Sequence, residues 1–115
     1  LGDAGADAYL REALDDLASG ASLSKARAIN AAWGSGDARA LDALIPDGIA
    51  GGAVTSDFTH RTLLGKRNPE MAERIGHLMK DGEVSFVGVG LFHLLGANGL
   101  PQLLSQRGYR VERVD

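Results

Sequence analysis

The stretch VSFVGVG, residues 84–90, runs directly into LFHLLG, residues 91–96, and it decides the predicted fold. Valine, phenylalanine and glycine dominate residues 84–90, a composition that suits a strand buried on both faces, as in a parallel sheet. A single histidine, His93, follows this segment between bulky apolar neighbours. We therefore predict a buried parallel strand with an imidazole just past its carboxyl end.

The residues after His93 predict the rest of a strand–helix–strand unit. Residues 98–107 place leucines at helical spacing and end at Gly108, and residues 109–114, YRVERV, alternate apolar with polar side chains as a half-buried strand does. The crossover between two parallel strands of one sheet is right-handed. We therefore expect the chain to end in a right-handed βαβ unit.

The first half of the chain has the pattern of helices instead. Residues 4–19, residues 24–33 and the stretch after Asp37 carry apolar side chains at spacings of three and four. Within residues 4–19 this apolar face is formed mainly by leucines, and two aspartates fall on the other face. Residues 57–66 predict a fourth helix.

Asn68 and Pro69 give the clearest helix start in the chain. The Asn68 side chain can accept a backbone N–H as N-cap, Pro69 suits the first helical position, and Glu70 complements the helix dipole. Gly82 is expected to end this helix in the left-handed conformation. These residues predict a fifth helix that begins at position 69.

Together these elements predict the α/β class. Several N-terminal helices are expected to pack on a small, mainly parallel sheet, with residues 1–47 as a helical part and residues 48–115 as an α/β part of a single domain. Two or three strands are too few for a parallel sheet whose edges are all paired. The chain is therefore expected to be part of a larger fold, or to pair with a second copy of itself.

Composition narrows the classes of function. The chain has 115 residues, a net charge of −3 and no cysteine. Nucleic acid is not an expected partner, because it requires a concentrated positive face. Without cysteine, disulfides and thiolate metal sites are excluded. Residues 1–115 contain no run of 18 or more apolar residues, the length that would span a membrane.

His93 is the first candidate functional residue. Ligands of open α/β sheets bind at the carboxyl ends of strands, where His93 is expected to lie, and Gly90 would let a ligand approach the strand closely. An imidazole there can bind a metal ion or act as a general acid or base. The alternative is a packed histidine whose ring is satisfied by a backbone carbonyl.

Arg67 is the second candidate, because a guanidinium beside a helix N-terminus can receive an anion or a carboxylate. The alternative is an ordinary surface arginine. Glu73 and His77 are four residues apart, a spacing that can hold a metal ion. For this pair we favour a solvated helix-surface interaction over a metal site.

Three stretches carry a family resemblance: AAWGSGDARAL (31–41), LLGKRNPEMAERI (63–75) and FVGVGLFHLLGANGLPQLLSQRGYRVERV (86–114). In these the chain resembles the C-terminal half of the TraB/GumN family, which is related to the Tiki proteases. The last stretch matches the family's ending almost position by position, from G-x-x-H through a glycine-containing turn and a helix to R-G-Y. The resemblance covers most of residues 24–114.

The resemblance implies metal-dependent hydrolysis of peptides. Members of the family carry two G-x-x-H motifs, a glutamate and an Arg-Asn pair near the site. Gly90 and His93 match the second G-x-x-H, and Arg67 and Asn68 match the Arg-Asn pair. By resemblance, His93, Arg67 and Asn68 are the catalytic candidates, His93 is also a metal ligand, and Gly90 belongs to the binding site.

The first G-x-x-H and the glutamate would lie in an N-terminal half that is not present here, so the site for a divalent metal ion is expected to be incomplete. The expected function is the C-terminal portion of a TraB/GumN-like metal-dependent hydrolase that is inactive in isolation. Its expected partners are that N-terminal half or a second copy, and a peptide substrate. The resemblance also implies a bacterial protein that is exported or periplasmic. The alternative is a non-catalytic ligand-binding or protein-interaction module.

Overall fold

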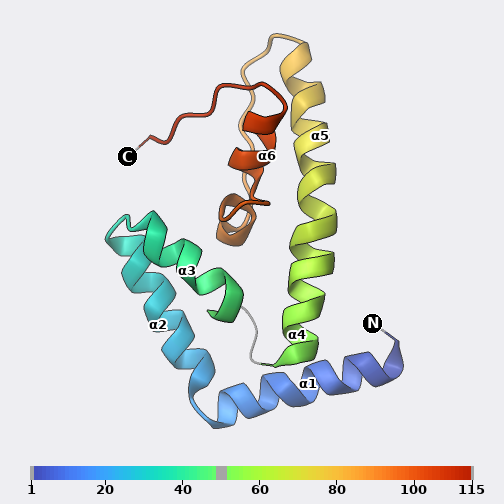
Figure 1. The fold of residues 1–115 in the computed structure, drawn as a ribbon, viewed down its shortest axis with the longest axis vertical. Coiled ribbons are helices and arrows are strands. Elements are labelled where there is room, and N and C mark those ends of the chain that lie inside the picture. Colours follow the sequence, from blue (N-terminus) through green and yellow to red (C-terminus); the bar gives the residue numbers. More distant parts are fainter. Residues whose placement is uncertain (1, 49–51, 115) are drawn as a thin grey trace. The chain divides into compact units, whose positions relative to one another are not determined.

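The computed structural model describes residues 2–48 and 52–114 of the chain, and most of them are helical (Figure 1). In chain order the elements are α1 (Asp3–Ala18), α2 (Ala21–Gly34), α3 (Ala38–Gly48), α4 (Ala53–Phe58), the π-helix η1 (Thr59–Lys66), α5 (Arg67–Lys80), the 3₁₀ turn η2 (Leu91–Leu94) and α6 (Leu100–Gln106). The chain divides into two compact units, one up to Arg61 and one from Thr62 on. None of the described helices is long and apolar enough to cross a membrane.

The predicted α/β fold with a mainly parallel sheet is wrong. Across residues 2–48 and 52–114 no residue belongs to a strand. The helix expected within the βαβ unit does form, as α6, but residues 84–90 before it and 109–114 after it lack sheet pairing. There is accordingly no parallel sheet and no βαβ unit within the part of the chain that the structure describes.

The error has a physical reason. A strand needs a neighbour, because extended backbone satisfies its N–H and C=O groups through ladders with adjacent strands. The composition of residues 84–90 suggested burial on both faces, yet Val84 is 104% and Phe86 97% exposed. Apolar β-branched and aromatic residues favour a pleated, half-buried surface, but they do not supply the partner that creates one.

In the first unit, α1 packs against α2 and α4, and α2 packs against α3. Ala32 and Leu41 are buried there, and the rings of Tyr9 and Phe58 meet edge to face with their centroids 6.0 Å apart. Asp37 caps α3, since its Oδ1 accepts the backbone N–H of Ala40 at 3.0 Å. α1, α2 and α4 begin without a side-chain cap, so packing between the helices has to hold this unit together.

The apolar face of α1 is not the face that packs. Leu10, Leu14 and Leu17 are all more than half exposed. Glu12 makes the contact instead: its carboxylate accepts the backbone N–H groups of Thr55 (2.8 Å) and Val54 (3.1 Å) and the Thr55 hydroxyl (2.7 Å). The Thr55 backbone N–H, then its hydroxyl, lower the pKa of Glu12 below its usual value, because they stabilise the charged form.

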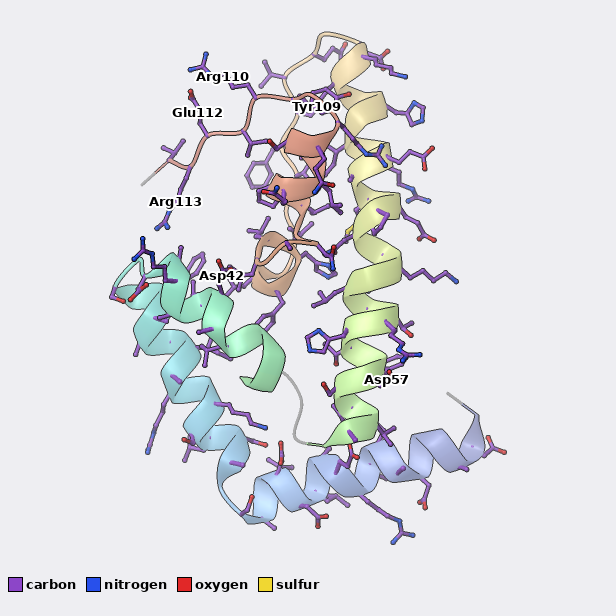
Figure 2. All side chains as sticks on the ribbon, in the orientation of Figure 1. Asp42, Asp57, Tyr109, Arg110, Glu112 and Arg113 are labelled. Carbon is purple, nitrogen blue, oxygen red and sulfur yellow. The ribbon has the colours of Figure 1, made fainter. Side chains whose placement is uncertain are left out.

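In the second unit, α5 packs against α6 through small residues. Ala72 is fully buried and Gly76, one turn further along α5, is buried as well. The Tyr109 hydroxyl reaches the backbone oxygen of Gly76 at 3.4 Å, and Figure 2 shows the Tyr109 side chain directed at α5. This packing fixes the face of α5 from which the candidate site is built.

Left-handed glycines end the two helices of this unit, as predicted. Gly82 follows α5 with φ 71° and Gly108 follows α6 with φ 89°. Beyond Gly108 the chain is extended, and Arg110 pairs with Glu112 along it (Figure 2).

Candidate functional site

Asn68 on α5 and His93 on η2 are joined directly by their side chains. The Oδ1 atom of Asn68 lies 2.5 Å from Nδ1 of His93. The Nδ2 atom of Asn68 donates to the backbone oxygen of Asn98 at 2.7 Å. Asn68 is only 1% exposed. One buried carboxamide therefore connects α5, the 3₁₀ turn and the loop before α6.

The predicted N-cap role of Asn68 is wrong. The π-helix η1 leads directly into α5, so the backbone is already helical at Lys66 (φ −88°, ψ −43°) and no side-chain cap is present. A cap is needed only where a helix leaves its first N–H groups unpaired. Because the backbone just before Arg67 is already helical, the Asn68 side chain is available for a contact with another segment.

A short turn brings His93 to Asn68. The backbone N–H of His93 donates to the oxygen of Gly90 at 3.0 Å, which closes the 3₁₀ turn η2. Gly90 has φ −64° and ψ 148°, a conformation open to any residue. A Cβ at Gly90 would lie 3.8 Å from Cδ2 of His93, an ordinary contact distance. The turn therefore needs the backbone of Gly90 and not its missing side chain.

The loop at residues 96–99 presents the Asn98 carbonyl to Asn68. Gly96 has φ 74°, in the left-handed region, and its oxygen accepts the Gly99 N–H at 3.0 Å. At Gly99 a Cβ would lie 2.6 Å from the backbone oxygen of Leu95, closer than real Cβ atoms come. This position therefore requires glycine for the loop to keep its shape.

The electrostatics of the site favour a neutral imidazole. Burial, and after it the positive charge of Arg67, lower the pKa of His93 below its usual value of 6.5. At neutral pH His93 is therefore uncharged, the form in which a ring nitrogen can accept a proton or bind a metal ion.

Arg67 itself is the exposed first residue of α5. No free helix N-terminus lies beside Arg67 to help it bind an anion, as had been expected, because η1 runs directly into α5. The positive charge of Arg67 contributes, after burial, to lowering the pKa of His93. Arg67, Asn68, Gly90 and His93, named from the sequence, thus lie in one neighbourhood of the second unit.

The described residues do not fit a complete metal centre. A hydrolytic metal ion takes about three protein ligands and keeps an open position. Among residues 2–48 and 52–114 no group of three or more His, Cys, Asp or Glu side chains is arranged to hold a metal ion. Glu73 and His77, 3.9 Å apart on α5, are both largely exposed and form the solvated pair that was predicted.

A comparison with protein-family models identifies the chain. The model of the TraB/PrgY/gumN family matches residues 1–113, essentially the whole sequence. The chain belongs to the TraB/PrgY/gumN family. The predicted family is therefore confirmed, and the match also covers residues 1–23, where no motif was recognised. No curated protein and no solved structure matches this TraB/PrgY/gumN chain significantly.

Two features of the site were not predicted from the sequence of this TraB/PrgY/gumN chain. The first is the carbonyl of Asn98, which escapes prediction because every residue has a backbone oxygen. The second is the steric requirement at Gly99. The run GANG at residues 96–99 was the available signal, since closely spaced glycines and asparagine indicate a tight turn.

Proposed function

We propose that this TraB/PrgY/gumN chain supplies one side of the site of a metal-dependent hydrolase that acts on peptides. The observation that carries the proposal is the side-chain hydrogen bond between Asn68 and His93, which holds a neutral imidazole near the charge of Arg67. Family membership and the match of Gly90–His93 to a G-x-x-H motif support the same reading.

In the proposed reaction His93 acts through Nε2, because Asn68 already occupies Nδ1. A neutral imidazole near pH 7 can take a proton from an attacking water and return it to the leaving amine. Arg67 would bind the carboxylate of the substrate or the oxyanion that develops at the scissile carbonyl. Asn68 holds the imidazole, and Gly90 closes the turn on which it lies.

Nε2 cannot act as a base and as a metal ligand at the same time. If it binds a metal ion, its lone pair is used in that bond, and the ion in place of the ring would activate water and polarise the scissile carbonyl. His93 is the one residue of the site with the chemistry of a ligand, so further ligands would have to join it. We propose that a partner completes the set, either another polypeptide segment of the family's domain or a second copy of this chain.

One observation favours a second candidate, a non-catalytic binding module. The polar atoms of the Asn68 amide and Nδ1 of His93 all find partners inside the chain. Buried networks of this kind also occur purely to fix a structure. In that case His93 orders the segment before α6, and the neighbourhood of Arg67 recognises an anionic ligand without chemistry.

A titration with Mn²⁺, followed by NMR, separates the two candidates. Paramagnetic broadening reports even weak metal binding, so a partial site is detectable. The hydrolase proposal expects broadening centred on residues 67–68 and 90–94 that disappears in His93→Ala. His77→Ala is the matched control, because it removes an imidazole that is only paired with Glu73 on the surface of α5.

The Mn²⁺ titration can support or overturn the metal role of His93. Broadening that persists in His93→Ala, or that is centred on Glu73 and His77, overturns the metal role of His93. Broadening that is lost in His93→Ala and kept in His77→Ala supports it. In any preparation of the protein that cleaves peptides, His93→Ala should abolish cleavage, and unchanged cleavage would refute the catalytic role.

A further inference from the structure

We infer that Asn68 is a positioning residue that fixes the tautomer of His93, with the proton on Nδ1 and the lone pair on Nε2. The inference deepens the proposed function, and it rests on that function only for the chemical use of Nε2. The geometry of three groups carries it: the Asn98 carbonyl, the Asn68 carboxamide and the His93 ring.

The first step is the orientation of the carboxamide. A carboxamide has a donor end, NH₂, and an acceptor end, C=O. The backbone oxygen of Asn98 can only accept, so the group 2.7 Å from it must be the NH₂ of Asn68. The acceptor end of Asn68 consequently faces His93. The hydrogen bond with Asn98 thus settles an orientation that side-chain shape alone does not fix.

The second step is the proton on the ring. The Oδ1 atom of Asn68 has no hydrogen, so at 2.5 Å from Nδ1 it requires Nδ1 to be the donor. A neutral imidazole carries one N–H, and the other nitrogen keeps its lone pair. The lone pair therefore lies on Nε2.

The third step is rigidity, because Asn68 can fix the tautomer of His93 only if its own side chain is held in place. Asn68 is buried on α5, and its side chain is enclosed on the face that also carries Ala72. The loop that presents the Asn98 carbonyl is held by Gly96 and by the lack of space for a side chain at Gly99. A histidine ligand or base commonly takes its tautomer from such a partner on its other nitrogen.

The test is long-range ¹H–¹⁵N correlation NMR of the metal-free, ¹⁵N-labelled chain at a pH above 6.5. The wild-type spectrum should show His93 with a protonated Nδ1 and an unprotonated Nε2. The exposed ring of His77 provides an internal reference for a solvated histidine. A proton found on Nε2 of His93 overturns the inference without any mutant.

Variants extend the test. Asn68→Ala should release His93 to a mixture of tautomers. Asn68→Asp keeps an acceptor for Nδ1–H but loses the NH₂ group that donates to the Asn98 carbonyl. It therefore separates the two hydrogen bonds of Asn68, and the proton should stay on Nδ1 while the loop before α6 loses its contact with α5. Gly76→Ala is the control, because the added Cβ would lie 3.1 Å from the Tyr109 hydroxyl and so perturbs α5 away from Asn68. The His93 signals of this variant should match those of the wild type.

An unchanged tautomer in folded Asn68→Ala would refute the positioning role. If Asn68→Ala does not fold, the wild-type spectrum still decides, since a proton on Nε2 of His93 contradicts the inference. These spectra are independent of the Mn²⁺ titration. A failed metal test with an Nδ1–H tautomer therefore removes the proposed function and leaves the role of Asn68 intact.

Discussion

Two glycines of the second unit should respond in opposite ways to the same added methyl group. At Gly90 a Cβ meets only Cδ2 of His93 at 3.8 Å, and the backbone angles suit alanine. At Gly99 a Cβ meets the oxygen of Leu95 at 2.6 Å and its carbonyl carbon at 2.9 Å. These neighbours are backbone atoms, so they cannot turn aside as a flexible side chain would.

The magnitudes follow from this difference. Alanine in place of a glycine with compatible angles stabilises by about 0.4–1 kcal/mol, because the unfolded chain has fewer conformations to lose. Gly90→Ala should gain about that much. Gly99→Ala has the same entropic gain, but it also carries an overpacking cost of about 1–3 kcal/mol. The net loss is therefore on the order of 1 kcal/mol. The free energies of unfolding of the two variants should therefore differ by about 2 kcal/mol.

Native-state hydrogen exchange of the α5 amides measures this difference, because it reports on the second unit by itself. Gly99→Ala should exchange faster than wild type and Gly90→Ala no faster. Equal protection in the two variants, or weaker protection in Gly90→Ala, would refute the steric argument for the loop. Gly99→Ala should also displace the Asn98 carbonyl and so disturb the His93 tautomer, which Gly90→Ala should preserve.

Three further predictions concern pH and packing. Because the pKa of Glu12 is lowered from 4.5, the stability it provides is present above that pH and is lost as the pH falls; acid unfolding followed by circular dichroism should lose this pH dependence in Glu12→Gln. The pKa of His93 is lowered from 6.5, so protonation below that pH should weaken the second unit, and His93→Gln should remove this dependence from its hydrogen exchange. Leu100 is 2% exposed. Leu100→Ala should lose about 2–5 kcal/mol in urea unfolding, and a loss below about 1 kcal/mol would contradict its place in the core.

Helix positions were largely predictable from the sequence, because periodicity and glycine ends are local signals. Residues 4–19 were predicted and Asp3–Ala18 is observed, and Gly82 and Gly108 end α5 and α6 as expected. Which face of a helix packs was less predictable. The leucines of α1 form its apolar face, yet Glu12 makes the contact with α4, where its carboxylate accepts three hydrogen bonds.

The strands and the role of Asn68 were not predictable, for a common reason. Residues 84–90 have strand composition, but pairing depends on a neighbouring segment that composition does not reveal. Asn68 before Pro69 has the local signature of an N-cap, and its true partners lie 25 and 30 residues away. In both cases the neighbouring residues in the sequence suggested a structure, but contacts with residues far away in the sequence decide which structure forms.

The family resemblance supplied what local patterns could not. It placed Arg67, Asn68, Gly90 and His93 in one site, and the structure brings these residues together. The resemblance did not point to the carbonyl of Asn98, although the run GANG at residues 96–99 indicated a tight turn there. Sequence comparison therefore indicated which side chains to consider, and the atomic connections among them required the structure.

The exposed apolar side chains of residues 84–90 bear on how the protein behaves when concentrated. Residues 84–92, VSFVGVGLF, contain neither a charge nor a proline. Such windows, when extended and uncovered, are templates for intermolecular cross-β stacking. A charged residue that would oppose such stacking, Glu83, lies just before this segment and not within it. We therefore expect the concentrated protein to aggregate slowly on storage, and Phe86→Lys should reduce this aggregation.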